Sequence, residues 1–227
     1  MSKQFRLPET IQQMEFIAWQ SLPVVLFCVA FAAIVTILES AFHMRMAIQN
    51  DSMVPGFAAM LILRELAVVV TALLVTSRVG AGMTAEISSM KITEQVEALK
   101  MLGIQPWNFI WMPRFIASIL SLALLTALAN SFCLFSAFWV SNTYLGFSQG
   151  MFIGSLQRFI DLQDFLLSLV KGAAFGAIIP TVSYYFGMNC KDGAEGVGQS
   201  TTNSVVCSSL LIILVDFALG YMFSFLY

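Results

Sequence analysis

The sequence predicts an all-α membrane protein, and two observations support that fold class. Hydrophobic residues make up 59% of the 227 residues, and the mean hydropathy is +0.84. Charged residues make up only 11%, whereas soluble domains carry about 25%. We therefore expect a single transmembrane domain over residues 1–227. No basic cluster is present, so we expect no nucleic-acid partner.

Five apolar stretches are each long enough to cross a membrane. A span needs about 20 mostly apolar residues. The bilayer core offers no partner for exposed backbone groups, so such a segment must be a helix. We expect spans at residues 21–38, 55–82, 111–140, 165–186 and 202–226.

Residues 1–20 precede the first span and carry an amphipathic pattern. Leu7, Ile11, Met14 and Ala18 recur at helical spacing and form one apolar stripe among polar residues. This predicts a helix that lies in the membrane interface. The alternative is a polar extension of the first span.

Lysine and arginine in the connecting segments predict the orientation, because cytoplasmic loops are enriched in these residues. With the N-terminus inside, the inner segments hold Lys3, Arg6, Lys91, Lys100 and Lys191, with Arg78 and Arg114 near the inner surface. The outer segments hold Arg45 and Arg158. We expect a cytoplasmic N-terminus and a periplasmic C-terminus.

Residues 83–110 join the second and third spans on the cytoplasmic side and contain a short predicted helix. Thr93 is a candidate N-cap, Glu94 and Glu97 lie early, and Lys100 lies late, as the helix dipole favours. Gly103 is the stop signal. A helix this short is marginal alone in water, so it must dock on a membrane or a protein.

The two faces of this short helix differ. At 100° per residue, the charged side chains share one face, and Val96, Ala98, Leu99 and Leu102 share the other. From periodicity alone, an ordinary amphipathic loop helix is the favoured interpretation.

Four charged residues interrupt the spans, namely Arg64, Glu65, Lys171 and Asp216. Each would cost about 2.5–3.5 kcal/mol if isolated at mid-helix. They must face the bundle, a partner or water. One hypothesis is that they line or gate a lipid-headgroup cavity, and the other is that they pair and fix the bundle.

Two further sets of residues need an explanation. Glu86 lies near the inner end of the second span, where Arg114 is its candidate partner.

Gly193, Gly196 and Gly198 resemble a phosphate-binding loop but lack the lysine of that motif. We expect a flexible turn there, with Thr201 or Thr202 opening the last helix.

Two blocks of sequence resemble the MlaE/YrbE permease family, the membrane subunits of MCE-type ABC lipid transporters. The first block matches the family pattern at Arg78, Val79, Gly80, Ala81, Ala85, Glu86, Met90, Lys91, Thr93, Glu94, Gln95, Ala98, Leu99, Gly103, Pro106, Pro113 and Arg114. The second block matches at Gly193, Glu195, Gly196, Val197, Gly198, Thr201, Thr202, Val205, Val206 and Asp216.

The resemblance implies a mechanism. Family members work as homodimers in the bacterial inner membrane, and each copy binds a cytoplasmic ABC ATPase. The permease binds no cofactor, while ATP and Mg are held by the ATPase. The coupling residues would be Lys91, Thr93, Glu94, Gln95, Glu97 and Lys100. The charged face of the short helix would meet the ATPase, and its apolar face would pack on the spans. An MCE-domain protein on the periplasmic side takes part in moving lipids, usually phospholipids, to or from the outer membrane. Some systems add a small cytoplasmic regulatory subunit.

One departure from the family concerns the second span. Family members often have Arg-Glu-x-Gly-Pro there, but in this chain Ala67 and Val68 stand in place of the glycine and the proline. A kink at this point is therefore in doubt.

Two other functions were weighed against the ABC permease. A proton-coupled secondary transporter could use Glu65, Lys171 and Asp216, and it would need no ATPase. A membrane enzyme acting on lipids would need a metal cluster or a nucleophile–base pair, and the sequence contains neither pattern.

Overall fold

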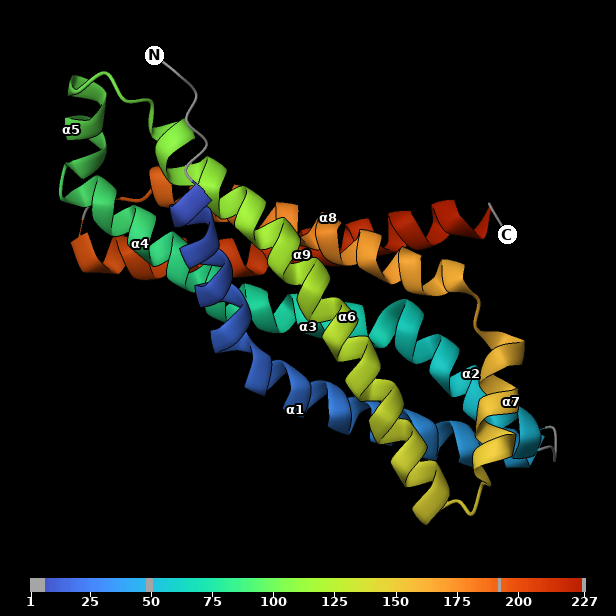
Figure 1. Ribbon diagram of the computed structural model, residues 1–227. Coiled ribbons are helices and arrows are strands. Elements are labelled where there is room, and N and C mark those ends of the chain that lie inside the picture. The colour runs from blue at the N-terminus through green and yellow to red at the C-terminus, as the bar shows by residue number, and fades with distance from the viewer. Residues whose placement is uncertain (1–6, 48–50, 192, 226–227) are drawn as a thin grey trace. The chain divides into compact units, whose positions relative to one another are not determined.

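The computed structural model describes residues 7–47, 51–191 and 193–225, and these residues form helices and no strand (Figure 1). The predicted fold class is confirmed. The chain divides into two compact units. Unit 1 takes the described residues within Met1–Ser21, Ala72–Ala123 and Gly172–Tyr227, and unit 2 takes those within Leu22–Thr71 and Leu124–Lys171.

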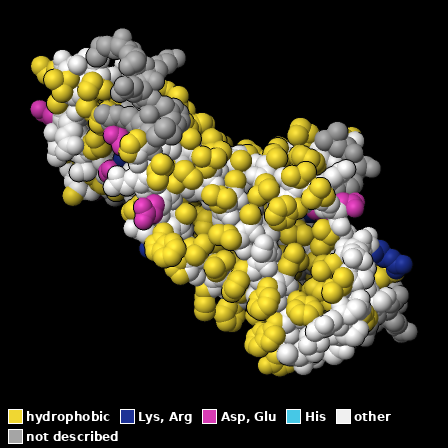
Figure 2. Space-filling view, viewed as in Figure 1, with side chains coloured by type: hydrophobic (Ala, Val, Ile, Leu, Met, Phe, Trp, Pro, Cys, Tyr) yellow, Lys and Arg dark blue, Asp and Glu magenta, His cyan; other side chains and the backbone are white. Residues whose placement is uncertain are grey.

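Among the described residues, five helical stretches are long and apolar enough to cross a membrane, as predicted. They are Pro8–Met44, Val54–Ile92, Trp107–Thr143, Leu162–Met188 and Gly193–Ser224. Their lengths range from 27 to 39 residues, whereas about 20 residues cross the hydrocarbon core. The helix ends therefore extend beyond the core. Hydrophobic side chains cover much of the face seen in Figure 2, as expected for a surface that contacts lipid.

The predicted helix before the first span is present and is continuous with that span. Helix α1 covers Leu7–Ala47 and contains Pro23. Proline removes one backbone donor from a helix interior, yet α1 continues through it. The amphipathic N-terminal segment is thus the first part of the membrane helix, the arrangement considered above as the alternative.

The second span is one continuous helical stretch with two wider turns. It contains α2 (Val54–Leu61), the π-helical turn η2 (Ile62–Leu66), α3 (Ala67–Val75), the π-helical turn η3 (Thr76–Gly80) and α4 (Ala81–Ile92). Such π-turns are rare and are often found at functional sites. Turn η2 ends directly before Ala67 and Val68, the positions of the missing glycine and proline.

In unit 1, α4 packs along α9 (Gly193–Ser224), and small side chains bring the two helices together. Ser200, Ser204 and Ser208 recur every fourth residue on the buried face of α9. The Thr84 hydroxyl donates to Ser204 Oγ at 2.8 Å. A polar but narrow interface of this kind allows close packing of membrane helices.

A second close approach in unit 1 involves α6 (Met112–Thr143) and α8 (Leu162–Met188). A Cβ atom on Gly176 would lie 2.6 Å from the Ser118 carbonyl oxygen. Gly176 therefore serves packing inside this chain.

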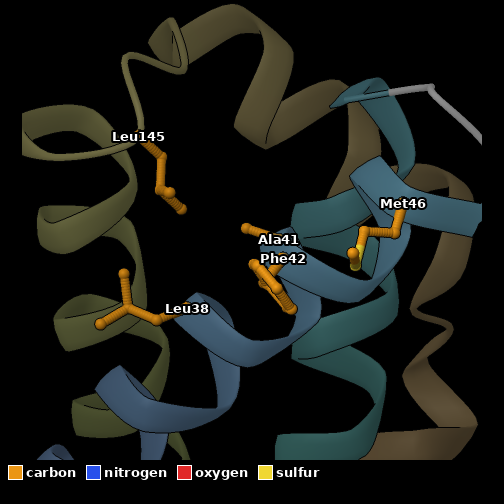
Figure 3. Close-up of a pocket in the computed structure, with 5 residues that line it drawn as sticks. All are labelled: Leu38, Ala41, Phe42, Met46 and Leu145. Carbon is orange, nitrogen blue, oxygen red and sulfur yellow. The ribbon is translucent and has the colours of Figure 1, made fainter.

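In unit 2, α2 packs against α7 (Gln149–Phe159), as Figure 1 shows. The Gly56 amide donates to Ser155 Oγ at 2.9 Å, and the Phe159 ring lies where a Gly56 side chain would be. An apolar pocket of about 380 Å³ lies at the end of α1. Figure 3 shows Leu145, from the connection between α6 and α7, facing Ala41 and Phe42 across this space.

Candidate functional site

Four charged side chains of unit 2 form two ion pairs, and we call them the membrane charge cluster. Arg64 Nε lies 2.6 Å from Asp164 Oδ1, and Lys171 Nζ lies 2.9 Å from Glu65 Oε1. Lys171 also donates to the backbone carbonyl of Arg64 at 3.1 Å. Three of the four predicted intramembrane charges are thus brought together by the fold.

The π-turn η2 places Arg64 and Glu65 where both reach the same helix. Asp164 and Lys171 lie two helical turns apart on α8, a spacing that puts them on the same face. The two adjacent residues of η2 therefore each meet an opposite charge on that face. The π-turn is present although Ala67 and Val68, and not a glycine and a proline, follow it in this chain.

Burial differs sharply within the cluster. The side chains of Lys171 and Asp164 are 0% and 1% exposed, whereas those of Arg64 and Glu65 are 32% and 49% exposed. A buried charge that loses its partner destabilises a protein by about 3–5 kcal/mol. The buried Lys171 and Asp164 therefore hold the cluster in place through their ion pairs. Their partly exposed partners, Glu65 and Arg64, present one negative and one positive group.

Sequence reasoning missed Asp164, because it lies next to an outer loop and looks like a loop residue. Its position 100 residues from Arg64 leaves no local signal for the pairing. Asp216, the fourth predicted intramembrane charge, belongs to unit 1, where it lies half-buried on α9.

The predicted brace between Glu86 and Arg114 is confirmed in unit 1. Arg114 Nη2 lies 2.7 Å from Glu86 Oε1, and Arg114 Nη1 donates to the Ile110 carbonyl at 2.9 Å. The brace joins α4 to the start of α6, whose second residue is the buried Pro113. Arg78 Nη1 donates to the Gln20 carbonyl on α1. These arginines tie the helix ends around the predicted cytoplasmic segment.

The predicted cytoplasmic helix exists as α5 (Gln95–Met101), but it begins differently from the prediction. Thr93 is not its N-cap, because Thr93 ends α4 and its hydroxyl donates to the Ser89 carbonyl at 2.8 Å. Glu94 takes the N-cap position with a left-handed backbone, φ 58°. A non-glycine residue in this region costs about 1–2 kcal/mol. The α4–α5 corner is therefore strained.

The C-terminal end of α5 is as predicted. Gly103 has φ 75°, its amide donates to the Lys100 carbonyl at 3.0 Å, and the Ile104 amide donates to the Leu99 carbonyl at 3.0 Å. This pair of hydrogen bonds is the Schellman motif that ends helices at a glycine.

The faces of α5 were predicted only in part. Val96 is buried with Ile87 and Ile110, and Leu99 packs against the same cluster. Ala98 and Leu102 were expected on this buried face, but both are exposed. At 100° per residue, Leu102 lies about 120° from the buried Val96 around the helix axis, so the outer surface of α5 carries Met101 and Leu102 beside the charged residues. Met101 is 89% exposed and Leu102 is 73% exposed.

We call this outer surface the α5 outer face. It is defined by its exposed side chains, which are Glu94, Gln95, Glu97, Ala98, Lys100, Met101 and Leu102. It combines two carboxylates, an ammonium group and two large apolar side chains. A fixed helix with this exposed surface is suited to binding another protein, because apolar contacts supply affinity and the charges supply specificity.

Lys91, also predicted as a coupling residue, makes a contact inside unit 1. Its Nζ donates to the Cys190 carbonyl at 2.7 Å. Cys190 follows the end of α8, so Lys91 binds the end of one span to the end of another. A Cβ atom on the neighbouring Gly187 would lie 2.7 Å from the Ile87 side chain. The end of α4 that carries α5 is therefore tightly packed on α8.

The predicted flexible turn at residues 193–198 is wrong. Gly193, Glu195, Gly196 and Gly198 form the first turns of α9, and Thr201 lies inside that helix with its hydroxyl on the Val197 carbonyl. Gly196 has a packing role, since a Cβ atom there would lie 2.1 Å from the Lys191 carbonyl oxygen. Gly80 likewise lies close to Ile179.

Among the described residues, no group of three or more His, Cys, Asp or Glu side chains could hold a metal ion. The geometry provides two ion pairs between candidate membrane spans and, outside the spans, a short helix with an exposed surface of charged and apolar side chains.

Comparison with known proteins gives a consistent result. The model of the family described as Permease MlaE matches residues 10–222. A probable ABC transporter permease protein of Rickettsia typhi is 35% identical over 208 residues, which cover 91% of this chain and 80% of the relative. The chloroplastic protein TRIGALACTOSYLDIACYLGLYCEROL 1 of Arabidopsis thaliana is 33% identical over 214 residues, which cover 94% of this chain and 61% of the relative.

A further relative is the intermembrane phospholipid transport system permease protein MlaE of Haemophilus influenzae. It is 30% identical over 213 residues, which cover 93% of this chain and 81% of the relative. With its five candidate spans and a family match over most of its length, the chain is a multi-pass membrane protein that belongs to the MlaE permease family.

Proposed function

We propose that this chain is the lipid-translocating permease subunit of an ABC transporter in a bacterial inner membrane. It works as a homodimer and moves phospholipids between that membrane and a periplasmic MCE-domain protein, for transport to or from the outer membrane. It is not itself an enzyme. A separate cytoplasmic ATPase holds ATP and Mg and performs the hydrolysis.

The observation that carries this proposal is the α5 outer face. Val96 fixes the helix on the core of unit 1, while Met101 and Leu102 remain exposed on the other side. Exposed apolar side chains beside charges mark a protein-binding surface. A movement of the ATPase would reach the spans through α5, the Lys91 contact and the Glu86–Arg114 brace.

The membrane charge cluster suits a lipid headgroup. Arg64 and Glu65 are partly exposed and of opposite sign, so a phosphate and an ammonium group can each find a partner there. Family membership favours this hypothesis over a proton-coupled transporter, since relatives are named as ABC transporter permeases. The cytoplasmic N-terminus and periplasmic C-terminus remain part of the proposal, as does a small cytoplasmic regulatory subunit.

The test is co-purification of the ATPase with variants of the α5 outer face in mild detergent. Glu97→Lys should lose the ATPase, because it reverses one charge of the binding surface. Glu39→Lys is the matched control and should retain the ATPase, because Glu39 is an exposed residue near the C-terminal end of α1. If the wild type purifies without an ATPase and Glu97→Lys does not change lipid transport, the ABC proposal fails.

A further inference from the structure

Unit 1 carries exposed aromatic side chains that take no part in the proposed transport. Trp19 on α1 is 76% exposed, Trp107 in the π-helical turn η4 (Trp107–Trp111) is 45% exposed, and Tyr185 on α8 is 62% exposed. They come from three different candidate spans, and all belong to unit 1. Tryptophan and tyrosine are the residues that membrane proteins concentrate where the hydrocarbon core meets water.

Hydrogen bonds connect the α1 and α8 members of this set through the second span. The carbonyl of Gln20, the residue after Trp19, accepts a hydrogen bond from Arg78 Nη1. Two residues after Arg78, the Gly80 carbonyl accepts a hydrogen bond from the Ser183 hydroxyl at 3.1 Å. Trp19, Arg78 and Ser183 therefore lie at about the same level of unit 1.

An aromatic contact adds the start of the third span to this level. Tyr184, which follows Ser183, packs edge-on against Trp107, and their ring centroids lie 5.4 Å apart. Side chains from four spans thus form one layer, which we call the aromatic layer. It consists of Trp19, Trp107, Tyr184 and Tyr185 together with the exposed Arg78.

The distribution of charge changes at the aromatic layer. On α1, Glu9 and Glu15 precede Trp19, whereas residues 20–38 carry no charge. At 1.5 Å per residue, this uncharged stretch rises about 28 Å, close to the thickness of about 30 Å of a hydrocarbon core. On the second span, the uncharged α3 lies on one side of Arg78 and the charged end of α4 lies on the other.

The exposed surface of α9 changes in the same way close to this level. Ser204 on α9 accepts a hydrogen bond from Thr84 at 2.8 Å, one helical turn after Gly80. Exposed side chains before Ser204 include Glu195, Gln199 and Asn203, and those after it include Val206, Leu210 and Ile213. An apolar surface that begins at the layer and continues along a candidate span is one that lipid covers.

We infer that the aromatic layer lies in the headgroup and glycerol region of the bilayer and fixes the depth of unit 1 in the membrane. Tryptophan and tyrosine suit this region, because each has an apolar ring and a polar group that hydrogen-bonds to headgroups or water. The Arg78 guanidinium has more N–H donors than its bond to Gln20 uses, so it can also bind lipid phosphates.

This depth places α5 outside the membrane. Helix α4 continues for 12 residues after Gly80, a rise of about 18 Å. The headgroup region on one side of a bilayer is only about 5–8 Å thick, so α5 lies in water. Lipid then does not cover Met101 and Leu102. The inference does not rest on the proposed function, because it concerns the bilayer and not the ATPase.

The test is tryptophan fluorescence of the chain in phosphatidylcholine vesicles that carry a nitroxide quencher either on the headgroup or near the end of the acyl chain. Two variants keep only Trp19 or only Trp107, with the other three tryptophans changed to phenylalanine. Both should lose more fluorescence to the headgroup nitroxide than to the chain-end nitroxide.

Two further variants, each in a background without the native tryptophans, calibrate the depth. Phe31→Trp is the matched control, because Phe31 is an exposed ring near the middle of the uncharged stretch of α1. It should lose more fluorescence to the chain-end nitroxide. Leu102→Trp should be quenched by iodide in the water and by neither nitroxide.

A second measurement guards against misfolding of the multiple variants. The difference in quenching between the wild type and the single variant Trp19→Phe isolates Trp19 with one conservative change, and it should show the same preference for the headgroup nitroxide. Three results would each overturn the inference. They are stronger quenching of Trp19 or Trp107 by the chain-end nitroxide, no quenching of either by both nitroxides, and quenching of Leu102→Trp by the headgroup nitroxide.

Discussion

The membrane charge cluster and the α5 outer face use charged residues in opposite ways. In the cluster, charges from distant parts of the chain pair with one another, and two of them are buried. On α5, Glu94, Glu97 and Lys100 point away from the core and are exposed. Charge inside a membrane must be matched within the protein, whereas charge on the exposed face of a helix outside the spans can match a partner. The first region should therefore govern stability, and the second should govern assembly.

The largest expected effect comes from breaking the ion pair of the buried Lys171. Glu65→Gln removes the carboxylate that lies 2.9 Å from Lys171 Nζ and should lower the free energy of unfolding by about 3–5 kcal/mol. The double variant Glu65→Gln with Lys171→Met removes both charges and should recover most of that loss. Unfolding in detergent with a denaturant series measures both. A loss below 1 kcal/mol for the single variant would contradict the pairing.

Substitutions on the inner face of α5 should lower stability, whereas substitutions on its outer face should weaken ATPase binding. Val96→Ala removes buried apolar surface and should destabilise the docked helix by about 1–3 kcal/mol. Met101→Ala alters an exposed side chain and should change stability by less than about 0.5 kcal/mol, yet weaken ATPase binding. Hydrogen exchange of the α5 amides measures the first effect, and co-purification measures the second. Equal losses of stability would show that α5 does not have an inner and an outer face.

The end of α5 offers a smaller effect. Gly103→Ala places a side chain at φ 75° and should loosen the last turn of α5 by about 1 kcal/mol. Gly198→Ala is the matched control, because its Cβ atom would meet nothing within 4 Å and alanine favours the helix. Exchange rates of the Lys100 and Leu102 amides report the difference. Unchanged rates in the Gly103 variant would argue against the Schellman ending.

The smallest effect concerns the strained start of α5. Glu94→Gly relieves the left-handed backbone and should stabilise the α4–α5 corner by about 0.5–1 kcal/mol. It also removes one carboxylate from the α5 outer face, so ATPase binding should fall. Thermal unfolding and co-purification should therefore change in opposite directions. A fall in both quantities would mean that Glu94 stabilises the corner through its side chain.

Features encoded locally were predictable from the sequence. The spans were predictable from apolar runs of sufficient length. The end of α5 at Gly103 was predictable because glycine readily adopts the left-handed backbone that ends a helix. The Glu86–Arg114 brace was also foreseen, because both residues lie at span ends on the same side of the membrane.

Features that depend on tertiary packing were not predictable. Asp164 contacts Arg64 only in the folded chain, because the two residues are far apart in the sequence. Thr93 is not the N-cap of α5, because Glu94 takes that position with a left-handed backbone. Leu102 is exposed because Val96 and Leu99 make the contact of α5 with the core. Gly196 looked like a loop glycine, but it allows the start of α9 to approach Lys191.

The most direct test of the central claim is charge exchange between α5 and its partner. Glu97→Lys on α5 should lose the ATPase, and a compensating Lys→Glu or Arg→Glu change on the ATPase should restore both binding and lipid-stimulated hydrolysis, while the free energy of unfolding stays constant. Binding that survives Glu97→Lys, Met101→Ala and Leu102→Ala together would contradict the claim that this face couples the membrane domain to ATP hydrolysis.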